Sequence, residues 1–336
     1  MDSLSQLALG AAVGIAVVGR RTTVWKAALW GGVCGTLPDL DAFIDHGDPI
    51  SNMTLHRAET HALLYLTLLS PAVAALAARW HGEMAQFRRW WLALWLALVT
   101  HPLLDLMTVY GTQLALPFTD HPFGVGSIFI IDPLYTLPLL VGVAGALAAR
   151  DTRRWRWNAA GLALSTAYLA WGVAAQQHVQ AAAQDSLRAQ GIQAQRLLVT
   201  PTAFNTLLWR VVVVTPSGYH EGFHSLLDRE RHIDFDAFPR GEALYEALRG
   251  HPPVERIAWF SHGLFKMDEH DGELRITDLR MGQEPHYTFT FVVAQRQSPR
   301  LATMAPRWVG QRPDMARVLP WLWRRALGQT TAAPPR

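Results

Sequence analysis

Histidine and aspartate residues gather in and beside apolar stretches of this 336-residue chain. His56 and His61 stand just before one apolar stretch, and His101 and Asp105 lie inside another. A charged side chain at membrane depth costs roughly 2.5–3.5 kcal/mol by insertion scales, so such residues are retained mainly where they act together. Imidazoles and carboxylates are also ligands of zinc and related ions. Metal binding is therefore the first chemistry that the sequence suggests.

The spacing within each pair decides how it could bind one ion. His101 and Asp105 are four residues apart, which places both on one face of a helix. This pair could bind a metal or form a hydrogen bond between helices. Asp39 and Asp41 follow Pro38, and a turn there could bring both carboxylates together, although an Asp-x-Asp segment can equally face solvent or cap a helix.

The histidines at 56 and 61 pose a different problem of geometry. Five residues of continuous helix would separate His56 and His61 by about 140° around the axis. They converge only if a helix begins between them, with Thr60 or Asn52 as its cap. Arg57 offers planar bidentate donors for an anionic oxygen, and its alternative role is that of an interfacial anchor.

Two further carboxylates lie at the starts of apolar stretches. Asp2 begins the first stretch, and Asp132 lies near the start of the fifth. Asp132 could be a ligand, a hydrogen-bond partner of a histidine, or a helix N-cap. The predicted topology places all of these groups at one end of a helix bundle. The candidate metal ligands are Asp2, Asp39, Asp41, His56, His61, His101, Asp105 and Asp132.

Composition indicates the elements that must position these residues. Half of the residues are hydrophobic and only 17% are charged, which is too apolar for an ordinary soluble protein. The sequence predicts an all-α transmembrane bundle of about five to six spans, followed by a small α+β extracytoplasmic domain. The predicted spans are 4–19, 24–38, 61–78, 90–109, 128–149 and 157–175.

Basic residues are concentrated in every second predicted connection. Ten Lys and Arg residues flank the first, third and fifth connections, whereas the other two, 39–60 and 110–127, contain only Arg57. This asymmetry predicts three cytoplasmic loops, with both termini and the C-terminal domain on the outer side. The basic charge is thereby explained by topology, and we expect no nucleic-acid partner.

The sequence pattern changes near residue 178. Residues 178–191 predict a polar helix, and β-rich runs follow at 207–214, 256–260, 274–279 and 287–293. We expect a membrane domain at 1–177, a soluble α+β domain at 178–327 and a disordered tail at 328–336. The single cysteine, Cys34, can form neither an internal disulfide nor a zinc–thiolate motif.

An ordered set of short motifs adds a family resemblance. The motifs are Met1-Asp2-Ser3-Leu4, Leu37-Pro38-Asp39-Leu40-Asp41, His56-Arg57-x-x-Thr60-His61, His101-x-x-x-Asp105, Leu116-Pro117-Phe118-Thr119 and Ile131-Asp132-Pro133. Over residues 1–175 the chain resembles the YdjM-like family of membrane-bound metal-dependent hydrolases. The later domain is similar to the C-terminal part of longer members. In one departure, Gln6 stands where family members commonly carry a histidine, and a glutamine is a poor zinc ligand.

The resemblance and the candidate site together imply a metal-dependent hydrolase in the bacterial inner membrane. The family is distantly similar to zinc phospholipases C and single-strand nucleases, which implies phosphoester chemistry. We expect a divalent metal, most plausibly zinc, with Asp41 or Asp105 taking a proton and Arg57 offsetting charge on the transition state. The expected partners are the bilayer and a lipid or other amphiphilic substrate at the outer membrane–water interface.

Two other functions are consistent with the same residues. The polar cluster could be structural in a non-catalytic polytopic membrane protein, with a closed coordination sphere around an ion. A transporter or ion pathway is disfavoured because the inner halves of the predicted spans lack matching polar groups. No G-x-S-x-G motif is present, so a serine nucleophile of that type is not expected. The sequence does not indicate an oligomeric state.

Overall fold

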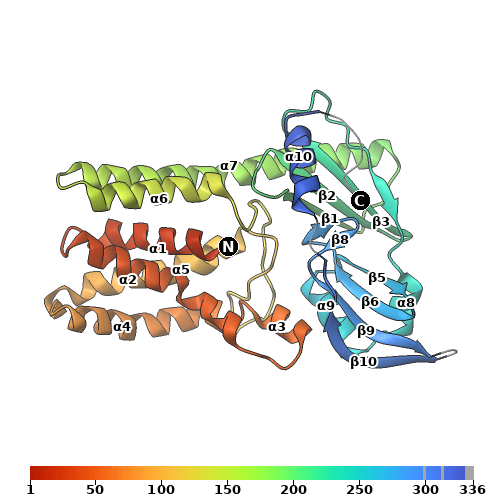
Figure 1. The fold of residues 1–336 in the computed structure, drawn as a ribbon, viewed down its shortest axis with the longest axis horizontal. Helices are drawn as coiled ribbons and strands as arrows, with labels where there is room; N and C mark the ends of the chain where they lie inside the picture. Colours follow the sequence, from red (N-terminus) through yellow and green to blue (C-terminus); the bar gives the residue numbers. More distant parts are fainter. Residues whose placement is uncertain (298–299, 312–313, 330–336) are drawn as a thin grey trace. The chain divides into compact units, whose positions relative to one another are not determined.

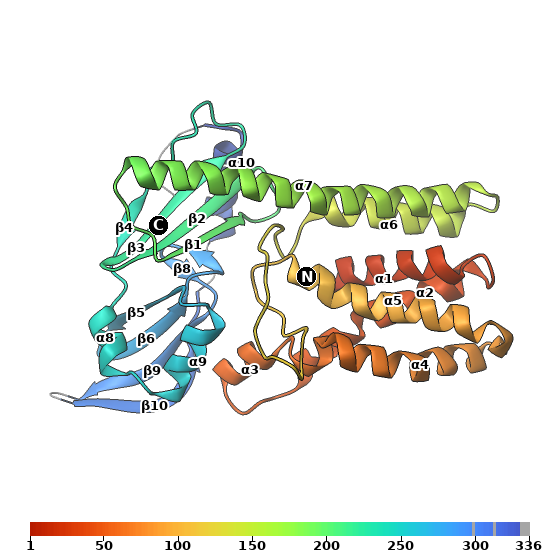
Figure 2. The same ribbon diagram turned by 180° about the vertical axis from the view of Figure 1, so that it is seen from behind.

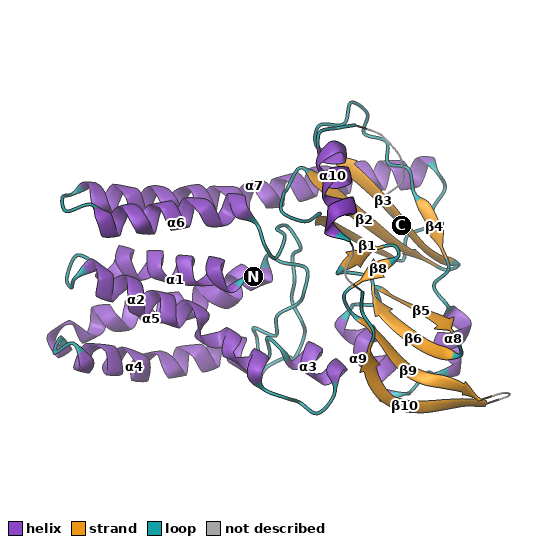
Figure 3. Ribbon diagram, in the orientation of Figure 1, coloured by secondary structure: helices purple, strands orange, loops and turns teal. Residues whose placement is uncertain are grey.

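The computed structural model describes residues 1–297, 300–311 and 314–329. Its contacts divide the chain into two units, which we call the helical unit (Met1–Ile44 and His56–Val173) and the sheet unit (Asp45–Leu55 and Ala174–Arg336). Figure 3 shows that strands are concentrated in the sheet unit. The division at Val173 falls inside a helix, close to the domain boundary that the sequence placed at 177. Of the predicted tail, residues 330–336 lie outside the described part of the chain.

The helical unit is built mainly from helices, and its longest connection lies between Leu106 and Pro133. Its helices are α1 (Ser3–Val18), α2 (Val24–Thr36), α4 (Leu63–Trp80), α5 (Phe87–Leu106), α6 (Pro133–Ala148) and the first part of α7 (Arg153–Ala189). Short 3₁₀ helices lie between them: η1 (Leu37–Phe43), η2 (Glu59–His61) and η3 (Met84–Gln86). Helix α1 packs against α2, α5 and α6, and α4 packs against α5 (Figure 1).

Glycines let α1 and α2 approach very closely. A Cβ atom on Gly10 would collide with the carbonyl oxygen of Gly31, and one on Gly35 would collide with that of Gln6. Small residues of this kind allow backbones to touch where larger side chains would hold helices apart. The contact brings the end of α2, which leads into η1, beside the start of α1.

The predicted bundle of five to six membrane spans is wrong. Among the described helices, only α4 is both long enough and apolar enough to cross a membrane. Helices α1 and α6 have 16 residues each and α2 has 13, or about 20–24 Å at 1.5 Å per residue, against a hydrocarbon core of about 30 Å. Helix α5 carries Arg88 and Arg89 at its start and Asp105 near its end. The prediction that the C-terminal domain lies on the outer side depended on five to six spans with alternating inner and outer loops. Without those spans, that prediction loses its basis.

The sheet unit contains two four-stranded antiparallel sheets. The first has the order β1-β2-β3-β4, and the second has the order β10-β9-β6-β5. Strands of the first sheet are β1 (Arg196–Pro201), β2 (Leu208–Thr215), β3 (Gly218–Ser225) and β4 (Asp236–Phe238). Those of the second are β5 (Phe265–His270), β6 (Glu273–Asp278), β9 (Thr290–Gln297) and β10 (Arg300–Trp308). A short hairpin pairs β7 (Gly282–Gln283) with β8 (His286–Tyr287).

Helices cover these sheets, and one of them was predicted as a strand. They are α3 (Pro49–Leu55), α8 (Glu242–Ala247), α9 (Pro252–Phe260), α10 (Met315–Ala326) and the second part of α7. The run 256–260, predicted as a strand, is the end of α9, whose first residues are prolines that are well suited to a helix start.

Strand β2 is buried on both faces. Val211 and Val213 pack against α7 residues such as Val179, and Figure 2 shows α7 running alongside this sheet. The alternate residues Val212 and Val214 pack on the opposite side of the sheet, because successive strand side chains point to opposite faces.

Candidate metal centre

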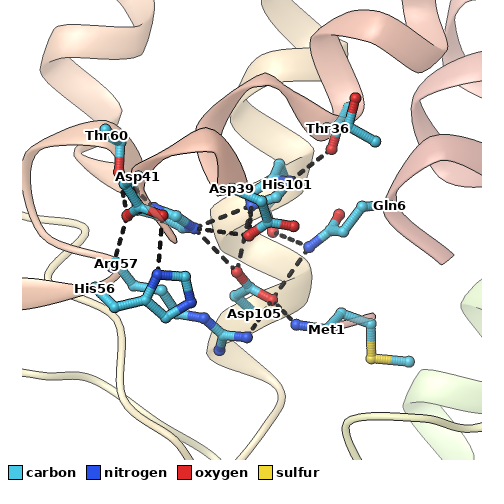
Figure 4. Close-up of polar contacts among 12 residues, drawn as sticks. Met1, Gln6, Thr36, Asp39, Asp41, His56, Arg57, Thr60, His101 and Asp105 are labelled. Carbon is cyan, nitrogen blue, oxygen red and sulfur yellow. Dashed lines mark hydrogen bonds and ion pairs between the residues drawn. The ribbon is translucent and has the colours of Figure 1, made fainter. Parts of the chain in front are cut away.

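Three helical elements bring the candidate ligands together. Asp39 lies on η1, where Pro38 occupies the first turn directly after α2. His61 ends η2, two residues before α4 begins. His101 and Asp105 share one face of α5, one turn apart. Ligand atoms of these four residues all lie within 4.8 Å of one another, and we call the group the metal centre (Figure 4).

The distances within the metal centre are similar to one another. The Nε2 atoms of His61 and His101 are 3.0 Å apart. Oδ2 of Asp105 lies 3.3 Å from Nε2 of His61 and 3.4 Å from that of His101. Oδ1 of Asp39 lies 3.6 Å and 3.4 Å from the same two nitrogen atoms. Ligands about 2.0–2.1 Å from a tetrahedral ion stand roughly 3.3 Å apart, so these five distances are close to those within one coordination sphere.

The hydrogen bonds behind the two imidazoles fix their tautomers. Nδ1 of His101 donates to the carbonyl oxygen of Gly35 at 2.7 Å. The Thr60 hydroxyl donates its single proton to Asp41 at 2.7 Å, so it must accept from Nδ1 of His61 at 2.9 Å. Both Nε2 atoms are then left with lone pairs that face the centre. This is the arrangement by which outer hydrogen bonds orient histidine ligands towards a metal.

The inward oxygen of Asp105 lacks a hydrogen-bond partner although it is fully buried. Two imidazole lone pairs and a carboxylate oxygen packed at 3.0–3.4 Å would repel one another if nothing lay between them. A shared proton could satisfy one pair of these atoms, whereas a divalent cation would satisfy all four. The residues present therefore fit a metal ion.

The second oxygen of Asp105 is held by three cationic or polar groups. The α-amino group of Met1 contacts it, Nε2 of Gln6 donates to it at 3.1 Å, and a terminal nitrogen of Arg57 lies 3.3 Å away. Figure 4 shows Gln6 and Met1 to the right of the carboxylate and the Arg57 guanidinium below it. Gln6 therefore supports a ligand through its amide group, and the amide oxygen that could itself have bound a metal has no partner.

Arg57 is buried in an uncommon backbone conformation. Its φ is +66°, in the left-handed region that non-glycine residues adopt at a cost of order 1–3 kcal/mol. Its amide donates to Asp41 at 3.0 Å, and its guanidinium donates to Thr108 at 3.2 Å and lies over the ring of Tyr110. The structure thus places Arg57 as a charge partner of Asp105, with only 4% of its surface exposed.

Asp41 joins the segment around His56 to the metal centre. Its Oδ1 lies 2.8 Å from Nδ1 of His56, and its Oδ2 accepts from Thr60 and from the amide of Arg57. Burial alone would raise the pKa of Asp41, but the hydrogen bonds from His56, Thr60 and Arg57 lower it to about 2. Burial also opposes ionisation of Asp39, yet contacts with His101 and His61 hold its pKa well below the usual range. Both carboxylates are charged at neutral pH.

The other two predicted ligands lie at helix starts. Asp2 caps α1 by accepting from the amide and hydroxyl of Ser5. Asp132 caps α6 by accepting from the amide of Leu134, and it also accepts from the hydroxyl of Tyr168 at 2.9 Å. Neither belongs to the group of four whose ligand atoms converge.

Sequence reasoning missed several supporting groups. The carbonyl oxygen of Gly35 and the side chains of Thr108 and Tyr110 carry no motif of their own. Thr108 follows Asp105 by three residues, and this one-turn spacing was the only available signal. The sequence predicts Thr60 as a possible helix cap and includes it in a family motif, but gives it no role beside Asp41. In the structure η2 does begin between His56 and His61, but the Thr60 side chain bonds Asp41.

Comparisons with known proteins agree with this part of the chain. The family model described as "YdjM inner membrane protein" matches residues 1–179, a little over half of the sequence. A relative from Bacillus subtilis (strain 168), named "Uncharacterized protein YfhP", is 23% identical over 318 residues. That alignment covers 87% of this chain and 90% of the relative. No solved structure matches the chain.

Proposed function

The chain belongs to the YdjM inner membrane protein family, and we propose that it is a metal-dependent hydrolase acting on a phosphoester of a lipid or other amphiphile. One observation carries the proposal. Ligand atoms of Asp39, His61, His101 and Asp105, which are buried or half-buried, all lie within 4.8 Å of one another, and the inward oxygen of Asp105 has no hydrogen-bond partner.

Two imidazoles and two carboxylates favour zinc among the divalent ions. When bound, such an ion supplies Lewis acidity, which polarises a phosphoryl oxygen and makes water a stronger acid near neutral pH. The outer hydrogen bonds to His61 and His101 hold both rings in the tautomer that a metal requires. Arg57 and the α-amino group of Met1 balance part of the negative charge of Asp105.

His56 is the side chain best suited to move a proton beside the centre. Its ring is about a quarter exposed, and Nδ1 is bonded to the ionised Asp41, so Nε2 carries the lone pair in the neutral tautomer. Both oxygens of Asp41 accept hydrogen bonds, and Asp105 is fully buried. In this proposal the two carboxylates therefore orient neighbouring groups, and His56 accepts the proton. Asp39, at 18% exposure, is the most exposed ligand and marks the side from which substrate would approach.

The position of the centre in the helical unit supports an amphiphilic substrate. His61 stands two residues before α4, the helix that is long and apolar enough to cross a membrane. One end of such a span lies at the level of lipid headgroups, where the phosphate groups of phospholipids are found. A membrane-associated phosphoester is therefore the substrate class that best fits.

A structural metal site is the second candidate, and one observation favours it. Four protein ligands are typical of closed structural zinc sites, whereas catalytic sites usually keep one position open. The two functions differ in what they require of His56, because a structural ion would not depend on a neighbouring base.

The first test is the metal content of the detergent-purified full-length protein. We expect about one equivalent of zinc or another divalent ion in the wild type and its loss in His101→Ala. The matched control is His121→Ala, which removes an exposed histidine of the same unit. A wild type that neither contains nor takes up a divalent ion would overturn both functions.

The second test separates catalysis from structure. Hydrolysis of bis(4-nitrophenyl) phosphate and of phospholipid in mixed micelles should stop on chelation and return with added zinc. His56→Gln should keep its ion but lose on the order of 10²–10⁴-fold in rate, the usual contribution of a general base. A full complement of ion without hydrolysis of either substrate would favour the structural role.

A further inference from the structure

Three connections at one end of the helical unit lie side by side. They join α1 to α2, α4 to α5, and α6 to α7, and both views place them at the same end (Figures 1 and 2). Glu83, between α4 and α5, accepts from Thr22 of the first connection and from Lys26 at the start of α2, both at 2.8 Å. Arg20 lies over the ring of Trp155, near the start of α7, at 5.3 Å. The three connections therefore form one continuous surface.

This surface combines exposed tryptophans with exposed arginines. Trp25, Trp80 and Trp157 are 47–75% exposed near the helix ends. The arginines that project from the same connections include Arg21, Arg79, Arg88, Arg89, Arg150 and Arg156, all exposed. We call this set the Trp–Arg surface.

The acidic groups of these connections do not offset its charge. Glu83 is engaged inward by Lys26, Thr22 and the indole of Trp90, and Asp151 is paired with Arg153. The six exposed arginines of the surface thus keep a net positive charge. A strongly cationic surface with interleaved indoles fits an anionic partner that also has an apolar body.

The position of the Trp–Arg surface at the end of α4 indicates the kind of anionic partner. Helix α4 runs from Leu63 to Trp80, or about 27 Å, close to the thickness of a hydrocarbon core. Among the described helices, α4 alone is long and apolar enough to cross a membrane, and Arg79 and Trp80 are where it would leave the apolar layer. Tryptophan prefers this interface, and arginine there contacts lipid phosphates.

We infer that the Trp–Arg surface binds the phosphodiester headgroups of anionic phospholipids, at the opposite end of α4 from the metal centre. The guanidinium groups recognise phosphate oxygens, and the indoles hold the headgroup region against the helix ends. This inference does not depend on hydrolysis, because the metal centre adjoins the start of α4 and the Trp–Arg surface adjoins its end.

Binding of defined lipids to the full-length protein in neutral detergent tests the inference, with native mass spectrometry as the readout. Phosphatidylglycerol should bind at least about tenfold more tightly than phosphatidylcholine, since each basic residue near an anionic lipid is worth roughly fivefold in affinity. The triple variant Arg79→Gln/Arg88→Gln/Arg89→Gln should weaken phosphatidylglycerol binding on the order of 100-fold and leave metal content unchanged.

The matched control replaces three exposed arginines of the sheet unit: Arg188→Gln/Arg249→Gln/Arg296→Gln. It should bind phosphatidylglycerol as the wild type does. Equal binding of the two lipids by the wild type, or wild-type affinity in the Arg79/Arg88/Arg89 variant, would overturn the inference. Displacement of the lipid by millimolar inorganic phosphate would do so as well, because it would identify a site for free phosphate.

A second measurement uses the wild type alone, in case the triple variant does not fold. Raising the salt from 50 to 500 mM should weaken phosphatidylglycerol binding severalfold and leave phosphatidylcholine binding unchanged, because exposed charges are screened. Salt-independent binding of phosphatidylglycerol would contradict an arginine–phosphate interaction.

Discussion

Each unit of this protein buries a polar cluster, and the two clusters differ in how their atoms are satisfied. The metal centre of the helical unit leaves the inward oxygen of Asp105 without a hydrogen-bond partner. The sheet unit contains a second cluster, which we call the sheet network and which comprises Arg210, Tyr219, Glu221, Lys266, Glu284 and Tyr287.

The sheet network pairs its own charges. Arg210 donates to Glu221 at 2.6 Å, to the carbonyl oxygen of Leu279 at 2.7 Å and to the hydroxyl of Tyr287 at 3.0 Å. The other oxygen of Glu221 accepts from the amide of Glu284. Glu284 in turn accepts from Lys266 and Tyr219. Among the described residues, none of these six side chains has a buried atom without a partner.

The contrast shows how to tell a structural polar cluster from a binding site. Buried polar groups in folded proteins are nearly always hydrogen-bonded, because an unpaired one costs about 1–3 kcal/mol. The sheet network meets that requirement with protein atoms alone. In the metal centre, the inward oxygen of Asp105 has only the Nε2 atoms of His61 and His101 beside it, at 3.3 and 3.4 Å, and a divalent cation would satisfy all four ligand atoms at once.

Removing the ion should produce the largest difference between the two clusters. If the ion is present at about 1,000 times its dissociation constant, its binding stabilises the helical unit by about 4 kcal/mol. Chelation should therefore increase amide hydrogen exchange at 36–43 and 56–62 strongly, whereas exchange at 209–221 stays unchanged. Equal changes in both regions would contradict the distinction between a site that needs an ion and a network that does not.

Breaking the sheet network should give the next largest effect. Arg210→Met leaves the carboxylate of Glu221 buried and unpaired, which we expect to cost roughly 3 kcal/mol in the free energy of unfolding. Metal content should not change. The double variant Arg210→Met/Glu221→Leu should regain most of the loss, and the exposed control Arg296→Met should stay near wild type. A single variant as stable as the wild type would show that the network contributes nothing.

Thr60 offers a smaller change within the metal centre. Thr60→Val removes the hydroxyl that links Nδ1 of His61 to Asp41, so the ring loses its orienting partner. We expect metal affinity to fall about 10–100-fold by competition with a chromogenic chelator. Thr60→Ser should restore it, and the exposed control Thr152→Val should have no effect. Unchanged affinity in Thr60→Val would mean that the ring is held by packing alone.

Gln6 should give the smallest effect. Gln6→Leu removes the hydrogen bonds to Asp105 and to the carbonyl oxygen of His101, but it also removes a buried amide oxygen that has no partner. The net cost should be about 1 kcal/mol, or roughly fivefold in metal affinity. Gln177→Leu, at an exposed position, is the matched control. Complete loss of the ion in Gln6→Leu would instead identify Gln6 as a direct ligand.

The sequence located the metal centre more successfully than it predicted the membrane topology. His101 and Asp105 are one helical turn apart, so helix geometry alone placed them together. Asp39 and His61 could be nominated by residue type and motif, but nothing in their spacing placed them beside α5. The motifs were also sufficient to identify the family, whose model matches residues 1–179.

The predicted span 61–78 corresponds to α4, whereas the others are wrong for two reasons: α1, α2 and α6 are too short, and α5 and α7 are long enough but not sufficiently apolar. An apolar run can extend through a connection, whereas a span needs about 20 residues of continuous helix. Helix α2 ends at Thr36 after 13 residues, where Pro38 starts the 3₁₀ helix that carries Asp39. The segment that ends α2 therefore leads directly into the 3₁₀ helix that supplies the Asp39 ligand.

By itself, the sequence determined which residue types this protein places in apolar surroundings, the helical pairing of His101 with Asp105, and the change to β-structure after α7. These follow from local periodicity and chemistry, which act over a few residues. Only the tertiary structure decided that four ligand atoms converge, that Gln6 and Arg57 hold the far side of Asp105, and that Asp2 and Asp132 cap helices. Convergence depends on packing between segments distant in the chain, such as the glycine contact of α1 with α2, and no local pattern encodes those distances.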